Sequence, residues 1–288
     1  MSRLRHSETG LWNASSIGRP PTYYSKEYIW RIDMEKLLEL RSVGYSYHTV
    51  QGETPALTNI NFTVYKGEFV AVVGPSGCGK STLLSLLSGL LEPEHGSILL
   101  YGQKLFHPGS GTIGYMLQHD HLFEWRTVWQ NVLLGPEIQK KLTPAKKEAV
   151  ADMLKTYGLY KFKDAKPSQL SGGMRQRAAL IRTLALEPEL LLLDEPFSAL
   201  DYQTRLTVGD DIGTIIKKEH KTAVLVTHDL SEAVSLASRV IILTSRPGTI
   251  QRILPVTFDS NLSPLLRRNT PEFKDYFNEI WKEMNEND

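Results

Sequence analysis

A glycine-rich segment at residues 74–81, Gly-Pro-Ser-Gly-Cys-Gly-Lys-Ser, most constrains the fold of this chain. It matches the pattern G-x-x-x-x-G-K-[ST] and lies between an apolar run at 69–73 and a helical leucine pattern. Such a loop cradles phosphates because its backbone N–H groups point inward and the following helix adds partial positive charge. Lys80 can reach the β- and γ-phosphates, and the Ser81 hydroxyl can bind Mg²⁺. This phosphate loop (residues 74–81) predicts a strand–loop–helix unit that binds a nucleoside triphosphate.

A second feature is an apolar run at 190–193 that ends in two acids, Asp194 and Glu195. A solvated strand end would explain one acid, but adjacent carboxylates after a buried strand suit a cation or a proton transfer. We expect Asp194 to hold Mg²⁺, directly or through water, and Glu195 to act as the general base toward water.

Strand and helix patterns alternate along most of the chain. Apolar or alternating runs predict strands near 37–43 and at 61–65, 69–73, 190–193, 223–227 and 240–243. Helical spacing predicts helices over 83–90, 143–157, 171–184 and 231–237, the second of them capped by Thr143 and Pro144. This order favours an α/β sheet with helices on both faces and a helical insertion.

Composition narrows the class of protein. The 288 residues carry 33 Lys and Arg against 32 Asp and Glu, a net charge of +1, which argues against the basic field of a nucleic-acid binder. One cysteine cannot form an internal disulfide, and the longest apolar runs are far short of the ~20 residues that cross a bilayer. We also find no signal-peptide pattern, so we expect a soluble protein of a reducing compartment.

The segment 170–176, Leu-Ser-Gly-Gly-Met-Arg-Gln, places a second glycine pair at a predicted helix start. Alone it could be a plain capped helix. Together with the phosphate loop upstream and Asp194 downstream, it resembles the signature motif of ATP-binding-cassette (ABC) ATPases, although Met174 stands where glutamine is usual.

The resemblance covers roughly residues 36–255 and implies roles for further residues. Gln118 matches the Q-loop glutamine, 198–201 the D-loop, and His228 the switch histidine. Tyr47 is placed like the aromatic that stacks on adenine, with Tyr45 as the alternative. The implied nucleotide-binding residues are Tyr47, Gly74, Pro75, Ser76, Gly77, Cys78, Gly79, Lys80, Ser81, Thr82, Gln118, Ser171, Gly172, Gly173 and Asp201; the implied catalytic residues are Lys80, Glu195 and His228, and the implied Mg²⁺ ligands are Ser81, Gln118 and Asp194.

The same resemblance implies a fold and domain boundaries. We expect a P-loop NTPase core with a mixed sheet, an antiparallel β edge and an inserted helical subdomain at about 120–188. The ATPase domain would span 34–255, after an N-terminal extension at 1–33 and before a helical tail at 256–288. In that tail an apolar stripe predicts a helix docked on its own domain, with a membrane-surface or regulatory role as the alternative. The stripe comprises Phe273, Tyr276, Phe277, Ile280, Trp281 and Met284.

The implied mechanism is ATP hydrolysis in a head-to-tail dimer. The chain has one phosphate loop and one signature motif, so it would pair with itself or with a similar chain. The Ser171 motif of one subunit would close over the γ-phosphate held by Lys80 of the other. ATP would favour the closed dimer, and hydrolysis would reopen it.

The sequence around 121–128 and at 245–250 resembles the nitrate/sulfonate/taurine importer branch. This implies a transporter subunit at the cytoplasmic face of the membrane, with separate permease subunits and an extracytoplasmic solute-binding protein as partners. DNA-repair and chromosome-maintenance ATPases are the other class, but they insert long coiled coils, whereas this chain has no sustained heptads. A tandem translation-factor ATPase would need two cassettes. We therefore expect no nucleic-acid partner.

Overall fold

The structure is a computed structural model that describes residues 35–50, 52–105 and 113–285. Contacts divide the chain into two units, Met1–Glu35 and Lys36–Asp288, and the described helices and strands belong to the second unit. The expected extension at 1–33 and the proposed domain start at Met34 lie outside the described residues. The domain boundary at 255/256 stays a prediction.

In the described part of the chain, six strands form a mixed sheet in the order β10-β9-β3-β8-β7-β6. Five of them run parallel, and β10 pairs antiparallel with β9 at the edge. All residues of β8 and β9 are buried, as expected where helices cover both faces. The strands are β3 (Phe69–Val73), β6 (Ile113–Met116), β7 (Leu190–Asp194), β8 (Thr222–Val226), β9 (Arg239–Leu243) and β10 (Ile250–Pro255).

A second, antiparallel sheet has the order β2-β1-β4-β5 and is the expected β edge. Its strands are β1 (Lys36–Thr49), β2 (Gly52–Tyr65), β4 (His95–Leu100) and β5 (Gln103–Lys104). The strands predicted near 37–43 and at 61–65 are therefore parts of longer ones. A backbone bridge between Leu57 and Gly248 joins β2 to the turn after β9.

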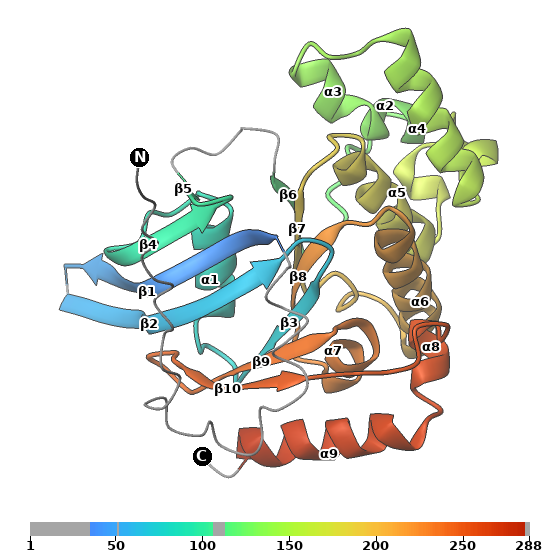
Figure 1. Ribbon diagram of the computed structural model, residues 1–288. Helices are drawn as coiled ribbons and strands as arrows, with labels where there is room; N and C mark the ends of the chain where they lie inside the picture. Colours follow the sequence, from blue (N-terminus) through green and yellow to red (C-terminus); the bar gives the residue numbers. More distant parts are fainter. Residues whose placement is uncertain (1–34, 51, 106–112, 286–288) are drawn as a thin grey trace, which may run out of the picture. The chain divides into compact units, whose positions relative to one another are not determined.

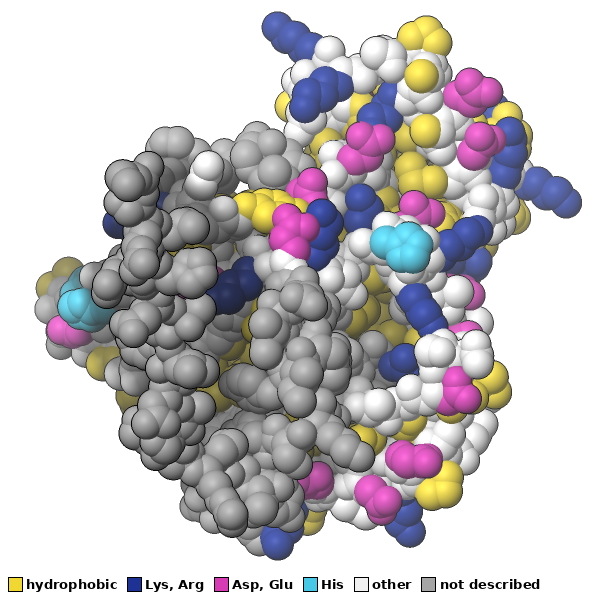
Figure 2. All heavy atoms as spheres, in the orientation of Figure 1, with side chains coloured by type: hydrophobic (Ala, Val, Ile, Leu, Met, Phe, Trp, Pro, Cys, Tyr) yellow, Lys and Arg dark blue, Asp and Glu magenta, His cyan; other side chains and the backbone are white. Residues whose placement is uncertain are grey.

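The helical insertion lies between β6 and β7 (Figure 1). Local sequence sets its helix starts: Thr127 and Gln130 form a capping box, and the Thr143 side chain accepts from the Lys146 N–H with proline at the next position. On the face shown in Figure 2 the insertion carries acidic and basic side chains side by side. Its elements are α2 (Val128–Val132), α3 (Leu134–Ile138), α4 (Pro144–Thr156), the 3-10 turns Tyr160–Phe162 and Pro167–Gln169, and α5 (Gly172–Leu184).

The faces of the main sheet belong to different apolar clusters because neighbouring strand residues point opposite ways. Val70 and Val72 pack with α1 (Lys80–Leu87) and the antiparallel sheet. Ala71 and Val73 pack with α7 (Leu230–Leu236). A third cluster joins β7 and β8 to α5, α6 (Tyr202–Lys218) and the insertion.

The C-terminal segment forms α8 (Pro264–Arg267) and α9 (Pro271–Asn285). Ile280 of α9 is fully buried in the cluster around α7, and four other residues of the predicted stripe pack against that cluster: Phe273, Tyr276, Phe277 and Met284. Trp281 departs from the expectation, because 56% of its surface is exposed. Helices of the described residues are all too short or too polar to traverse a bilayer.

Candidate nucleotide-binding site

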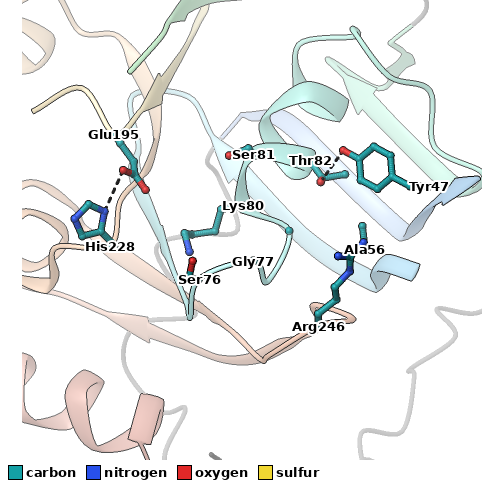
Figure 3. A pocket seen from close by; sticks show the side chains of 11 residues that line it. Tyr47, Ala56, Ser76, Gly77, Lys80, Ser81, Thr82, Glu195, His228 and Arg246 are labelled. Atoms are coloured by element: carbon teal, nitrogen blue, oxygen red, sulfur yellow. Dashed lines mark hydrogen bonds and ion pairs between the residues drawn. The ribbon is translucent and has the colours of Figure 1, made fainter. Parts of the chain in front are cut away.

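A pocket of about 620 Å³ opens between the phosphate loop, the antiparallel sheet and the carboxyl ends of the parallel strands (Figure 3). Ligands of open α/β sheets bind at this edge, where the strands end. Its lining residues are Tyr47, Ala56, Ser76, Gly77, Gly79, Lys80, Ser81, Thr82, Glu195, His228 and Arg246.

The phosphate loop adopts a conformation that its glycines permit. Gly77 and Gly79 have φ of 76° and 102°, a left-handed region that other residues rarely adopt. Buried Lys80 donates from Nζ to the carbonyl oxygens of Gly74 and Pro75, each at 2.8 Å. These bonds hold the ammonium within the loop, beside the first turn of α1, where an anion is favoured.

Glu195 and His228 meet at one end of the pocket (Figure 3). His228 Nδ1 lies 3.1 Å from Glu195 Oε2. The Glu195 N–H donates to the Val226 carbonyl at 2.9 Å, which ties the end of β7 to the segment that carries His228. Glu195 has a φ of 42°, a left-handed backbone conformation that residues other than glycine rarely adopt. Its side chain therefore does not follow the direction of β7. A carboxylate beside an imidazole at the phosphate end can accept a proton from water.

Asp194 ends β7 next to Glu195 but does not line the pocket wall. Burial raises the pKa of its carboxyl, while a hydrogen bond from the Tyr115 hydroxyl at 3.2 Å acts in the opposite direction. Burial and the Asp194 charge together raise the pKa of that tyrosine. Tyr115 therefore holds the Asp194 carboxylate as a hydrogen-bond donor, a contact that the sequence analysis did not identify.

Of the three residues expected to bind Mg²⁺, two have suitable oxygen atoms near the pocket and the third lies away from it. Mg²⁺ takes few protein oxygen ligands and keeps waters or substrate phosphates, and Ser81 and Asp194 supply a hydroxyl and a carboxylate of the right kind. No group of three or more His, Cys, Asp or Glu residues forms a metal site by itself within residues 35–50, 52–105 and 113–285. The third expected ligand, Gln118, is exposed, follows β6 and does not line the pocket.

The two tyrosines of β1 have different surroundings. Tyr47 lines the pocket, is 41% exposed, and its hydroxyl lies 3.1 Å from Thr82 Oγ1. Tyr45 is half-buried against the core. Its ring packs edge to face on that of Tyr47, with the two ring centroids 5.1 Å apart. Register shifts in the β1–β2 pairing on either side of Tyr45 break the simple alternation that would have put both side chains on one face. Of the two tyrosines, only Tyr47 lines the pocket.

The signature and D-loop residues lie outside the pocket. Ser171 caps α5 by accepting from the Met174 N–H, and Gly173 lies against α6, where an added Cβ would be 2.7 Å from Val208. Asp201 caps α6, and hydrogen bonds from Thr204 lower the pKa of its carboxyl.

Other residues expected to bind the nucleotide also do not line the pocket: Gly74, Pro75 and Cys78 of the phosphate loop, and Gly172 of the signature motif. The pocket of one chain is therefore lined by part of the phosphate loop and by Glu195 and His228, but not by the signature motif.

Arg246 and Ala56 line the pocket although the sequence analysis did not select them. Arg246 belongs to the segment 245–250 that follows β9, a segment noted only for its resemblance to one importer branch. Its position beside the pocket depends on contacts with β2, about 190 residues away along the chain, so no local pattern could have located it.

Comparison with known proteins gave consistent matches. The family model described as "ABC transporter" matches residues 57–198. An uncharacterized ABC transporter ATP-binding protein of Bacillus subtilis is 44% identical over 86% of this chain and 95% of its own length. A nitrate import ATP-binding protein of Synechocystis is 41% identical over 84% of this chain and 93% of its own length. An aliphatic sulfonates import ATP-binding protein of Bacillus licheniformis is 40% identical over 81% of this chain and 88% of its own length.

Among solved structures, a dimeric ATP-binding cassette in a post-hydrolysis state with ADP and phosphate matches with a TM-score of 0.65 and 30% identity. The match covers 77% of this chain and all of that one. The expected P-loop NTPase fold is thereby confirmed.

Proposed function

Because this chain belongs to the ABC transporter family as an ATP-binding subunit and ATPase, we propose that it powers import of a small oxyanionic solute of the nitrate or sulfonate type. A separate membrane permease would carry the solute. The observation that carries this proposal is the identity of about 40% to two import ATP-binding proteins, each over more than four-fifths of this chain. An extracytoplasmic solute-binding protein would deliver the solute to the permease.

The pocket supports distinct roles for its residues. Lys80 would bind the β- and γ-phosphates, and Tyr47 would stack on adenine. Glu195 would accept the proton of the attacking water, with His228 beside it contacting the γ-phosphate. Mg²⁺, which neutralises phosphate charge when bound, would be held by Ser81 and Asp194; Gln118 would have to move toward the pocket to join them.

The position of the signature motif supports a dimer. Ser171 and the glycines that follow it present a helix N-terminus that does not face the chain's own pocket. A second subunit related by a two-fold axis would place its Ser171 over the γ-phosphate, and the reverse contact would form the second site. ATP would then stabilise the closed dimer because only that form satisfies both halves of each site.

The helical insertion supports contact with a permease. The rings of Phe123 and Trp125 are in contact, with centroids 4.7 Å apart and planes inclined by 34°, and Trp125 is 71% exposed. Buried Asn131 organises this loop, since its side chain accepts from the Phe123 N–H and donates to the carbonyls of Phe123, Arg126 and Thr127. Packing inside the insertion would not explain why Trp125 is exposed. A rigid loop that presents aromatic rings suits docking of a membrane subunit.

The test is solute uptake by cells that lack this protein. Cells supplied with the wild-type chain should regain uptake of nitrate or of an alkanesulfonate, and cells supplied with Glu195→Gln should not, although both proteins should co-purify with the same membrane protein. Trp125→Ala should lose the membrane partner while the purified subunit keeps its ATPase activity. Unchanged uptake of both solutes in the deleted strain would refute the proposed solute class.

A further inference from the structure

The turn between β9 and β10 is built as part of the nucleotide pocket. The Thr244 N–H donates to the Thr249 carbonyl at 3.0 Å, and the Thr249 N–H donates to Thr244 Oγ1 at 2.9 Å. These bonds close the turn on itself. The Gly248 N–H donates to the Ala56 carbonyl, and the Thr58 N–H donates to the Gly248 carbonyl, each at 2.9 Å. The turn is thus attached to β2 beside Ala56, which lines the pocket.

Close packing fixes the turn against the phosphate loop as well. A Cβ added to Gly248 would lie 2.1 Å from the Cys78 carbonyl oxygen, so only glycine allows this approach. A Cβ added to Gly79 would lie 2.9 Å from the Ala56 carbonyl oxygen. The phosphate loop, β2 and the turn therefore form one closely packed body, and side chains of the turn have a defined position relative to a bound nucleotide.

Arg246 is the residue of this turn that enters the pocket. Its Nε donates to the Pro55 carbonyl at 3.0 Å, which directs the guanidinium past Ala56. Figure 3 shows Arg246 and Tyr47 at the same end of the pocket, while Glu195 and His228 lie at the other end and Lys80 between them. Within the part of the chain that the structure describes, no carboxylate forms an ion pair with Arg246, and the one carboxylate that lines the pocket, Glu195, lies at the opposite end.

We propose that Arg246 binds the adenosine half of the nucleotide, with its guanidinium against the face of the base opposite Tyr47. The inference rests on the proposed site, in which Lys80 receives the β- and γ-phosphates. A nucleotide bound in that direction brings its base to the end where Tyr47 and Arg246 lie. A guanidinium is planar and weakly hydrated, so it stacks on an aromatic face and gains cation–π attraction there. The tyrosine ring and the guanidinium would thus enclose the purine from two sides.

The test compares Arg246→Ala and Arg246→Lys with Arg41→Ala, a matched control. Arg41 is also an exposed arginine and lies on β1 of the antiparallel sheet. It does not line the pocket, and its guanidinium pairs with the Glu39 carboxylate at 2.8 Å. Dissociation constants of ATP and ADP are measured by titration calorimetry with the full chain. Inhibition of ATP hydrolysis by inorganic tripolyphosphate is measured with the same proteins, because tripolyphosphate has the phosphates but no base.

Arg246→Ala should raise the dissociation constants of ATP and ADP by the same factor, about tenfold. Its inhibition constant for tripolyphosphate should equal that of the wild type. Arg246→Lys keeps the charge but has no planar group, and it should raise the dissociation constant of ADP by at least about threefold. If Arg246→Ala does not fold, Arg246→Lys decides through the same measurements.

Equal weakening of ATP and tripolyphosphate would place Arg246 at the phosphates and overturn the proposal. Unchanged affinity for ATP and ADP in both variants would also overturn it. Lys80→Ala, measured by titration calorimetry with ATP, separates this failure from failure of the site itself. If Lys80→Ala also binds ATP normally, the proposed nucleotide site is wrong, and if it does not, only the role of Arg246 is wrong.

Discussion

Glu232 makes the stability of this protein depend on pH. It lies in α7, four residues after His228, and only 4% of its surface is exposed. The Thr227 hydroxyl donates to its carboxyl at 2.6 Å, and the Arg205 guanidinium is 3.9 Å away. Burial outweighs these contacts and raises the pKa of Glu232 to about 7. The folded protein therefore keeps a proton on Glu232 at a pH where the unfolded chain has released it.

The sign and size of the effect follow from that pKa. A carboxyl whose pKa is raised from 4.5 to about 7 stabilises the fold fully below pH 4.5, and this stabilisation is lost as the pH rises through 7. Between pH 5 and pH 8 the loss from this one group is about 2.5 kcal/mol. Glu232→Gln cannot ionise, and its amide oxygen can still accept from Thr227, so the variant should not show this loss.

The assay is urea unfolding of both proteins at pH 5, 6, 7 and 8, followed by circular dichroism and tryptophan fluorescence. The free energy of unfolding of Glu232→Gln, relative to wild type, should increase by about 2.5 kcal/mol from pH 5 to pH 8. Glu53→Gln, at an exposed position of β2, controls for removal of one negative charge. A difference between Glu232→Gln and wild type that stays constant over this range would refute the reasoning.

The nucleotide site and the C-terminal helix give three further tests. Glu195→Gln should bind ATP and elute as a dimer with ATP in size-exclusion chromatography, while hydrolysis falls by at least about 100-fold; near-normal hydrolysis would remove Glu195 from the base role. Mixed Lys80→Ala and Ser171→Arg subunits should form heterodimers that retain one ATP in a filter-binding assay, because one of the two composite sites is intact, and two retained ATP molecules would contradict the dimer geometry. Ile280→Ala should lower the free energy of unfolding by about 2–5 kcal/mol in urea, because it leaves a cavity beneath α9, and a loss under about 1 kcal/mol would show that α9 adds little to the core.

Features that depend on neighbours in the sequence were predicted well. Thr143 and Ser171 cap helices because their side chains accept N–H groups three residues ahead, and that relation is visible in the sequence. The phosphate loop follows from glycine positions and from the strand and helix that flank it. The helix predicted over 83–90 extends too far, because α1 ends at Leu87. Gly89 adopts a φ of 74° just after that end, so Leu90 lies outside the helix.

Features that depend on contacts between distant segments were missed. β2 begins at Gly52 rather than near 61, since pairing with β1 extends it through residues without a strand pattern. The different surroundings of Tyr45 and Tyr47 depend on register shifts in the same pairing. Tyr115 reaches Asp194, and Arg246 reaches Pro55, only because the sheet order brings these segments together. A sequence pattern reports periodicity along one segment and contains no information about such pairings.

The strand order has a consequence for synthesis on the ribosome. β3 is made first among the strands of the main sheet, yet both its neighbours, β8 and β9, are among the last. About 150 residues separate Val73 from Thr222, which at roughly 5–20 residues per second takes about 7–30 s. The antiparallel sheet, made of segments close in the chain, can form within that interval. β3 therefore lacks both of its neighbouring strands during that interval, so its apolar side chains and unpaired backbone edges are open to wrong pairing until β8 and β9 have been made.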